Sequence, residues 1–266
     1  MNANAPIGVF DSGVGGYSVA RVLQKMLPGE DLIYYGDGCN EPYGNRSRED
    51  LIHLVRQILD FMASKRVKAV AIACNTVSTL IDEFTGYDFP IFSIVHAGAD
   101  EVVRRNPAQV GVLSSCFTAR TGAYAKLINA AAPHIQVHNQ PSVKLGTLVE
   151  HSASNAEIAA EVRASLGQLA GAHPELDTLV LGCTHYPLVQ DIIVGEYPQF
   201  TNIIDPAVGQ VEQLRACLEA NNAFNEQGGS LWVYTSGDSV KYEALAARLD
   251  MKLSGPATEL HVATPL

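Results

Sequence analysis

Two cysteines, Cys74 and Cys183, each follow an apolar run and precede small polar residues. The runs, residues 70–73 and 179–181, are typical of buried parallel strands, and open α/β sheets bind ligands at the carboxyl ends of such strands. Two thiols that face one substrate from opposite sides can take a proton from one face of a carbon and return a proton to the other face. The sequence therefore predicts acid/base chemistry by a pair of thiols.

The surroundings of the two cysteines favour a chemical role over the alternative, which is that both are ordinary buried thiols. A thiol acts as a base near neutral pH only if its pKa falls below its usual value of about 8.5. His185 lies two residues after Cys183 and could support that thiol, and Asp11 could do so for Cys74. Cys183 and His185 could instead be a nucleophile and its base, although their direct pairing would depend on a turn.

Short polar side chains follow both cysteines. Asn75, Thr76 and Thr184 lie where helices are expected to begin, and side-chain donors together with free N–H groups bind carboxylates well. Ordinary helix capping is the alternative, but it explains less well why both cysteine segments carry such residues. We therefore expect these three residues to contact the substrate.

A glycine-rich turn after the first expected strand begins with Asp11 and Ser12. It lacks the G-x-G-x-x-G pattern of a dinucleotide loop, and Asp11 would repel a pyrophosphate. A plain tight turn is one interpretation. We prefer the other, in which Asp11 and Ser12 face the cleft while the glycines allow a close turn into the next helix.

The expected elements alternate between strand and helix in two similar halves. Strands are expected near residues 7–10, 31–37, 70–73, 90–95, 110–113, 135–138 and 178–181, and one helix near residues 118–131. The first strands of the halves begin 103 residues apart and the two cysteines lie 109 residues apart, which is typical of a tandem duplication, with chance as the alternative. The segment after Asp205 adds further elements, and nothing in it looks catalytic.

These elements predict an α/β fold of two similar doubly wound domains, each with a mostly parallel central sheet. We expect residues 1–97 plus 208–266 to form the first domain and residues 98–207 to form the second. The active site would lie in the cleft between the two domains, which a pseudo-two-fold duplication relates.

Composition excludes several classes of function. The chain of 266 residues is 47% hydrophobic and has a net charge of −10, which argues against nucleic-acid binding because phosphates need a basic face. No apolar run approaches the roughly 20 residues of a membrane span, and residues 1–6 do not resemble a signal peptide. The five cysteines lack zinc-site spacing, so no metal is expected, and reduced thiols point to the cytoplasm.

Four segments together resemble bacterial glutamate racemase, a cofactor-independent member of the aspartate/glutamate racemase superfamily. They are residues 10–16 (FDSGVGG), 42–44 (PYG), 74–76 (CNT) and 182–188 (GCTHYPL). The likeness runs from about residue 7 to about residue 249, in the same order and spacing. The first and last segments are specific, whereas the cysteine pair alone would indicate only the superfamily. Thr118 and Thr121 also match a family segment near the substrate. Glu150 matches the position of a family acid close to the second cysteine.

The resemblance implies interconversion of L- and D-glutamate, which supplies D-glutamate for peptidoglycan and therefore for the cell wall and cell shape. It implies that Cys74 takes the proton from the D-isomer and Cys183 from the L-isomer, with Asp11 and His185 beside them. No metal, pyridoxal phosphate or other cofactor is implied, and a homodimer is expected. The substrate contacts that the resemblance implies are Asp11, Ser12, Pro42, Tyr43, Gly44, Asn75, Thr76, Thr118, Thr121, Thr184 and His185.

Three segments depart from the family pattern, namely residues 38–41 (GCNE), 96–97 (HA) and 140–142 (QPS). The first of them places an acid, Glu41, beside the expected pocket for the substrate's side chain. These differences leave the thiol chemistry intact but bear on which amino acid binds. The alternatives are a racemase for aspartate or another amino acid, and a non-catalytic amino-acid-binding protein that retains the cleft. A decarboxylase of the superfamily is a weaker alternative, since it would need only one thiol.

Overall fold

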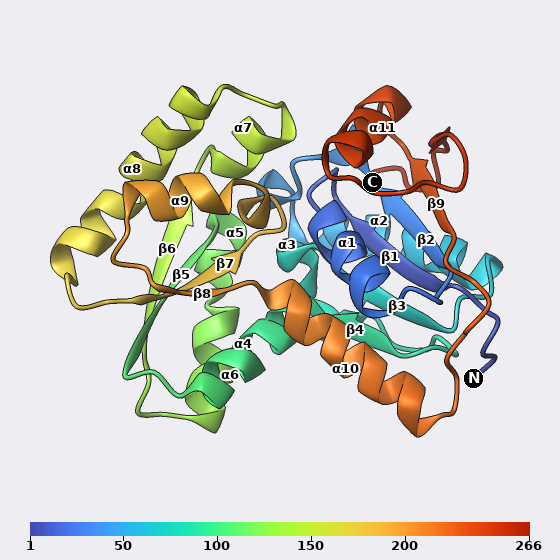
Figure 1. Cartoon of the computed structure of the whole chain (residues 1–266), viewed down its shortest axis with the longest axis horizontal. Helices are drawn as coiled ribbons and strands as arrows, with labels where there is room; N and C mark the ends of the chain where they lie inside the picture. Colours follow the sequence, from blue (N-terminus) through green and yellow to red (C-terminus); the bar gives the residue numbers. More distant parts are fainter.

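Two parallel β-sheets, each flanked by helices, form two units that lie side by side (Figure 1). The computed structural model describes residues 1–266. Both sheets consist of parallel strands, which confirms the predicted α/β class with two similar central sheets. Strands from the two ends of the chain share the first sheet, whereas the second sheet comes from the middle of the chain.

The first sheet has the strand order β10-β9-β2-β1-β3-β4 and the second has the order β6-β5-β7-β8. The order β2-β1-β3-β4 in one sheet matches β6-β5-β7-β8 in the other, as expected of a duplicated unit. The strands of the first sheet are β1 (Ile7–Asp11), β2 (Leu32–Gly36), β3 (Ala69–Ile72), β4 (Ile91–Ser93), β9 (Leu231–Thr235) and β10 (Thr258–Glu259). Those of the second are β5 (Gln109–Ser115), β6 (Gln136–Ser142), β7 (Thr178–Gly182) and β8 (Asn202–Ile204).

Helices cover the faces of both sheets (Figure 1). In chain order, the helices up to residue 131 are α1 (Tyr17–Met26), α2 (Arg48–Ser64), α3 (Asn75–Ser78), α4 (Ile94–Arg105), α5 (Cys116–Thr121) and α6 (Ala123–Ala131). The helices after residue 131 are α7 (Leu145–Glu150), α8 (Asn155–Ala172), α9 (Gln190–Glu196), α10 (Pro206–Ala220) and α11 (Ser239–Arg248). None of these helices combines the length and the apolarity that crossing a bilayer requires.

Burial explains why the sequences of the central strands are almost entirely apolar. Every residue of β1, β2, β3 and β7 is buried, as expected of strands that are covered on both faces. The edge strand β6 is mostly exposed or half-buried, and its course to Ser142 is longer than the expected strand near residues 135–138. Its polar sequence gives no apolar run from which that length could be predicted.

Two expected elements differ from the structure for local reasons. The strand expected over residues 90–95 ends at Ser93, because the Ser93 side chain accepts a hydrogen bond from the His96 backbone N–H and caps α4. The single helix expected near residues 118–131 is divided into α5 and α6, because Gly122 between them has a φ of 63°. Glycine adopts that left-handed conformation without a steric cost.

The largest apolar cluster is shared by both units. It contains Val9 and Leu32 of the first sheet, Val110 and Val180 of the second, and side chains of α4 and α10. Two smaller clusters each lie within one unit, one beside α2 and the other beside α8. Continuous packing along α4 and α10 therefore joins the two units.

The chain passes between the units at α4 and α10, which pack against each other along one side of the molecule (Figure 1). The domain boundaries expected at residues 97/98 and 207/208 fall inside these two helices. The boundaries themselves stay a prediction. The helix pair leaves the carboxyl ends of the central strands free to form a site between the units.

Candidate active site

A cavity of about 350 Å³ lies between the two units, where the strand ends of both sheets meet. The strands that lead to the cysteines, β3 and β7, hold equivalent positions in the two sheets, so each unit delivers one thiol. Most of the predicted site residues line this cavity: Ser12, Pro42, Tyr43, Gly44, Cys74, Asn75, Thr76, Glu150, Cys183, Thr184 and His185.

Cys74 lies at the N-cap of α3, just after β3. The residue is buried, and its sulfur lies 4.0 Å from Ser12 Oγ. Burial, and after it the nearby Asp11 carboxylate, raises the pKa of Cys74 well above its usual value. Cys74 is therefore a neutral thiol in this structure and has a proton to give.

A tight turn brings His185 against Cys183. The Tyr186 backbone N–H donates to the Cys183 carbonyl at 3.1 Å, and His185 Nδ1 lies 3.5 Å from Cys183 Sγ. Burial alone would lower the pKa of His185, but Cys183 and Glu150 outweigh burial and raise that pKa well above its usual value. The imidazole is therefore protonated and faces the Cys183 sulfur.

Glu150 contacts His185 from the C-terminal end of α7. Its Oε2 lies 2.5 Å from His185 Nε2 and accepts a hydrogen bond from the Val14 backbone N–H at 3.1 Å. Burial favours the neutral carboxyl, but His185 and Lys241 overcome this effect and lower the pKa of Glu150 to about 2. The acid expected near the second cysteine is thus a charged partner of His185.

Asp11 is buried at the end of β1 and does not line the cavity. Its Oδ2 accepts hydrogen bonds from the Gly16 backbone N–H at 2.7 Å and from Thr184 Oγ1 at 3.1 Å, whereas Oδ1 has no partner within the chain. Burial raises the pKa of Asp11, and the charge of His185 counteracts it. A Cβ atom on Gly16 would lie 2.5 Å from the Asp11 Cβ, so the close turn requires glycine there.

Asn75 and Thr76 present polar groups to the cavity from the start of α3. Asn75 Oδ1 accepts a hydrogen bond from Tyr124 Oη at 2.8 Å, and Asn75 Nδ2 is a buried donor without a partner within the chain. Thr76 Oγ1 lies 3.2 Å from Ser115 Oγ, which belongs to the other sheet. Both contacts cross between the units, so the polar groups beside Cys74 are held by residues of the second unit.

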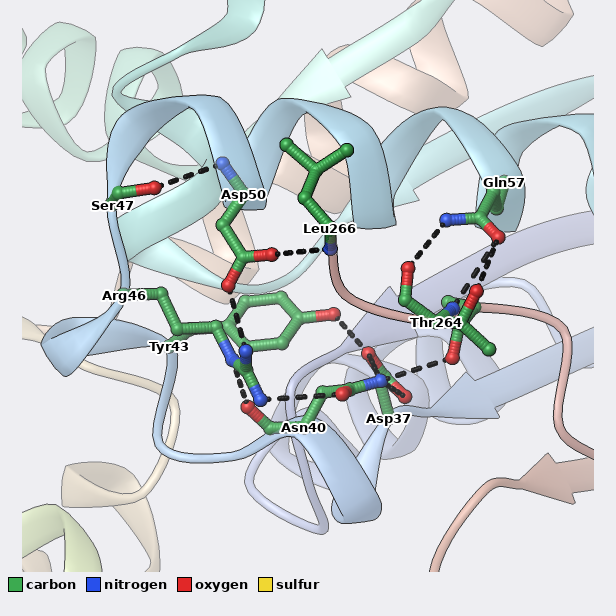
Figure 2. A network of polar contacts seen from close by, with 10 residues as sticks. Asp37, Asn40, Tyr43, Arg46, Ser47, Asp50, Gln57, Thr264 and Leu266 are labelled. Carbon is green, nitrogen blue, oxygen red and sulfur yellow. Dashed lines mark hydrogen bonds and ion pairs between the residues drawn. The ribbon is translucent and has the colours of Figure 1, made fainter.

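Tyr43 is held in the cavity wall by a buried carboxylate. Its hydroxyl donates to Asp37 Oδ2 at 2.6 Å, and the same carboxylate accepts a hydrogen bond from Asn40 Nδ2 (Figure 2). Ser236 Oγ also donates to this carboxylate. Arg46 donates in turn to Asn40 Oδ1 at 3.2 Å. The loop that carries Pro42, Tyr43 and Gly44 is therefore fixed by polar contacts on its far side.

The last residues of the chain lie along α2 and contact this loop (Figure 2). Asn40 Nδ2 donates to the Ala263 carbonyl at 3.1 Å, and the Leu266 backbone N–H donates to Asp50 Oδ1 at 3.2 Å. Gln57 on α2 bonds to the backbone of Thr264. The C-terminal segment, which shows little pattern in the sequence, thus braces one wall of the cavity.

Besides Asp11, two more of the expected substrate contacts do not line the cavity, namely Thr118 and Thr121. Thr118 Oγ1 accepts a hydrogen bond from Ser115 Oγ at 3.1 Å, and Thr121 Oγ1 donates to the Thr118 carbonyl at 2.7 Å. Both hydroxyls are occupied within α5 and its cap, so Ser115 reaches the cavity wall in their place. The residues of this part of the chain that face the cavity are Ser115 and Cys116, at the N-terminal end of α5.

Two more charged residues belong to the site, Glu41, which the sequence places beside the expected pocket, and Lys241, which it does not predict. Glu41, from the unusual segment 38–41, lines the cavity, and burial together with the charge of Glu150 raises its pKa to about 7. Lys241 on α11 lies 2.5 Å from Glu150 Oε1 and 3.7 Å from Glu41 Oε1. The segment after Asp205, in which nothing looked catalytic, therefore contributes a charge to the site. No local pattern signals this, because Lys241 meets Glu150 only through the tertiary fold.

The rest of the lining is small or polar, apart from Val143 and Tyr186. It consists of Gly38, Asn45, Ser115, Cys116, Ser142, Val143, Gly146, Thr147, His151, Gly182 and Tyr186. No group of three or more His, Cys, Asp or Glu side chains in the structure has an arrangement that could hold a metal ion. The chemistry that these residues can perform is proton transfer by thiols beside donors for an anion.

Several known proteins are similar to this chain in sequence. The family model of the Asp/Glu/hydantoin racemases matches residues 15–214. Glutamate racemase 2 of Caldanaerobacter subterraneus subsp. tengcongensis is 37% identical over 244 residues, which cover 91% of this chain and 91% of that protein. The family assignment thus rests on most of the length of both chains.

Solved structures share the fold as well. The glutamate racemase isoform RacE1 from Bacillus anthracis has a TM-score of 0.89 at 28% identity, over 98% of both chains. The glutamate racemase from Francisella tularensis subsp. tularensis, in complex with D-glutamate, has a TM-score of 0.87 at 28% identity, also over 98% of both chains. The chain therefore belongs to the Asp/Glu/hydantoin racemase family, within its group of glutamate racemases, and is an amino-acid racemase.

Proposed function

We propose that the protein interconverts L- and D-glutamate by proton transfer to and from two thiols, without a cofactor. The observation that carries the proposal is that Cys74 and Cys183 line one cavity from equivalent strand ends of the two units. Thiols that enter from different units can face opposite sides of one carbon. Similar proteins are named glutamate racemases, and the Francisella structure is a complex with D-glutamate, which supports glutamate as the substrate.

The protonation states of the two thiols determine which isomer the protein accepts. To take the α-proton of L-glutamate, Cys183 must react as the thiolate, and protonated His185 lies beside its sulfur. Cys74, a neutral thiol, then gives its proton to the opposite face of the carbon. The products are D-glutamate, a Cys183 thiol and a Cys74 thiolate, and this second form accepts D-glutamate for the reverse reaction. The thiols therefore titrate as a coupled pair.

Loss of the α-proton adds negative charge next to a carboxylate that is already charged, so hydrogen-bond donors must stabilise it. Asn75 Nδ2, a buried donor with no partner within the chain, is available beside Cys74, and the Thr76 hydroxyl, 3.2 Å from Ser115 Oγ, lines the same wall. Thr184 lies beside Cys183 in the opposite wall. We propose Ser12, Pro42, Tyr43 and Gly44 as the remaining contacts, with Asp11 and His185 assisting the thiols.

Glu41 in the cavity wall favours a second candidate, racemisation of aspartate or another amino acid. A charged Glu41 repels the side-chain carboxylate of a bound substrate. Lys241 lies 3.7 Å from Glu41 and reduces this repulsion, which keeps glutamate as the first candidate. The two candidates share the thiol chemistry and differ only in the group that occupies this end of the cavity.

The proposed activity places the protein in the cytoplasm as a source of D-glutamate for peptidoglycan, and hence for cell-wall synthesis and cell shape. We further propose that the chain divides into a first domain of residues 1–97 plus 208–266 and a second of residues 98–207. A homodimer is the expected assembly. Sedimentation of the purified protein, which should give about twice the mass of the chain, tests the assembly.

Incubation in deuterated water tests the activity directly. With L-glutamate, the protein should form D-glutamate that carries deuterium at the α-carbon. Labelling of aspartate but not glutamate would overturn the substrate, and no labelling of any amino acid would overturn racemisation. Cys74→Ser and Cys183→Ser should each nearly abolish turnover while glutamate still binds by calorimetry, and unchanged turnover in either variant would overturn the two-thiol mechanism.

A further inference from the structure

Lys241 connects the first unit to the second at the edge of the site. It lies on α11 in the unit of the six-stranded sheet, and its Nζ lies 2.5 Å from Glu150 Oε1 on α7 in the other unit. Glu41, from the same unit as Lys241, lies 3.7 Å from Nζ. The side chain of Glu150 is 4% exposed and that of Lys241 is 29% exposed, so the carboxylate is shielded from water while the lysine stays partly exposed.

The two oxygens of Glu150 have different partners. Oε1 accepts from Lys241, and Oε2 contacts His185 Nε2 at 2.5 Å. The other ring nitrogen of His185 lies 3.5 Å from Cys183 Sγ. A continuous series of contacts, from Lys241 through Glu150 and His185, therefore reaches the sulfur that takes the proton from L-glutamate.

We propose that Lys241 is a positioning residue for proton transfer at Cys183, because it holds the Glu150 carboxylate in the orientation that keeps His185 aimed at the sulfur. The inference rests on the proposed two-thiol reaction and adds a residue to it. Lys241 does not line the cavity, so it acts through Glu150 and not on the substrate.

Three carboxylates near His185 explain why a cation is needed there. Glu150, Glu41 and Asp11 all face this region, and Lys241 Nζ lies 2.5 Å from an oxygen of Glu150 and 3.7 Å from an oxygen of Glu41, so these two carboxylates are close neighbours. Two carboxylates at such short range repel each other strongly when water is excluded. Lys241 contacts both of them and offsets this repulsion. Without its charge, Glu150 is expected to rotate away from Glu41 and to release His185.

Because the Lys241–Glu150 ion pair joins the two units, the orientation of His185 depends on the relative position of the units. Glu150 belongs to one unit and both Lys241 and Val14, which contact it, belong to the other. Separation of the units would break these contacts together, while Lys241 would keep Glu41 as a partner in its own unit. His185 is therefore aligned with Cys183 only when the units meet around the substrate.

The variant that tests the proposal is Lys241→Met, which keeps the length of the side chain and removes its charge. Lys241→Arg keeps the charge, and Arg248→Met removes a charge from an exposed position of the same helix as a matched control. We expect kcat/KM to fall in Lys241→Met by up to about 100-fold, as misplacement of a catalytic group does. Arg248→Met should leave it unchanged, and Lys241→Arg should restore most of it.

Isotope effects distinguish positioning at Cys183 from a general loss of structure. In Lys241→Met the primary deuterium isotope effect on kcat/KM should rise with α-deuterated L-glutamate, because transfer to Cys183 becomes slower. It should fall with α-deuterated D-glutamate, because transfer to Cys74 then limits the rate less. A lower rate with both isotope effects unchanged would overturn the proposal.

Histidine titration by NMR gives a second test that needs no turnover. If Glu150 moves away in Lys241→Met, the pKa of His185 should fall, by on the order of one unit, because the ring loses its carboxylate partner. If Lys241 were only a nearby positive charge, its removal would raise the pKa of His185, and that result would refute the positioning role. Should the wild-type protein fail to racemise glutamate, this titration still decides the role of Lys241, while the proposed function fails separately.

Discussion

Thr184 donates a hydrogen bond of 3.1 Å to Asp11 and thereby joins the segment after Cys183 to the strand beside Cys74. Asp11 is the last residue of β1 in the first sheet, and Thr184 lies two residues after the end of β7 in the second sheet. The Asp11 carboxylate is also one of the causes that raise the pKa of Cys74. One side chain therefore both ties the units together and affects the protonation of a catalytic thiol.

Removing the charge of Asp11 should make Cys74 easier to deprotonate. In Asp11→Asn the burial of Cys74 remains but the carboxylate does not, so we expect Cys74 to react with iodoacetamide at lower pH than in the wild-type protein. Peptide mass spectrometry across a pH series measures the reaction at each cysteine. Cys39, which is exposed, should react alike in both proteins and is the internal control. An unchanged profile for Cys74 would show that Asp11 does not affect it.

Glu41 should make the protein less stable as the pH rises. Its folded pKa of about 7 lies above its ordinary value of 4.5, so between these values the folded state holds a proton that the unfolded state has released. Stability from this group is therefore present below pH 4.5 and lost by about pH 7. Glu41→Gln should gain on the order of 1–2 kcal/mol over the wild-type protein at pH 8 and little at pH 4.5, as measured by urea unfolding. An equal gain at both values would contradict the raised pKa.

Asn75 should be needed for the reaction more than for the fold. Asn75→Ala removes the unpaired Nδ2 donor beside Cys74, and we expect kcat/KM for glutamate to fall by about 10²-fold or more, as loss of one oxyanion donor does. Tyr124→Phe is the companion variant, since it removes only the hydrogen bond that orients Asn75. It should cost less activity than Asn75→Ala. The opposite order would mean that Nδ2 does not contact the substrate.

The contacts behind Tyr43 should affect substrate binding from a distance. Asn40→Ala removes the bonds to Asp37, Arg46 and the Ala263 carbonyl, so the loop with Tyr43 and Gly44 should loosen. We expect KM for glutamate to rise and the free energy of unfolding to fall by about 1–3 kcal/mol, because buried partners lose their hydrogen bonds. Thr264→Val, which alters an exposed residue of the same segment, should change stability by less than about 0.5 kcal/mol. A normal KM in Asn40→Ala would show that the loop holds its place without the C-terminal segment.

Much of the site could be predicted from the sequence because its residues follow strands directly. Cys74 and Cys183 come at the ends of apolar runs, and parallel strands bring their carboxyl ends to one edge of a sheet. The division at Gly122 and the early end of β4 at Ser93 were missed, since each depends on one backbone or side-chain contact that periodicity does not report.

The role of Lys241 could not be predicted from the sequence for a different reason, because it depends on a contact between distant segments. Its helix has the ordinary charged pattern of a surface helix, and its partner Glu150 lies on a short helix of the other unit. No local signal connects the two residues, because the ion pair arises only after β9 has joined the first sheet beside β2. The same holds for Ser115, whose place in the wall follows from the end of β5 and not from its own sequence neighbours.

The insertion of the whole second sheet between β4 and β9 has a consequence for synthesis of the protein. The first sheet cannot be completed until late in synthesis. Its strand β2 pairs with β9, and β9 is synthesised after the entire second sheet. Until residues 231–235 emerge, β2 presents an unpaired edge. A nascent chain that stalls before this point would expose that edge to other chains, so synthesis of β9 protects the first sheet from aggregation.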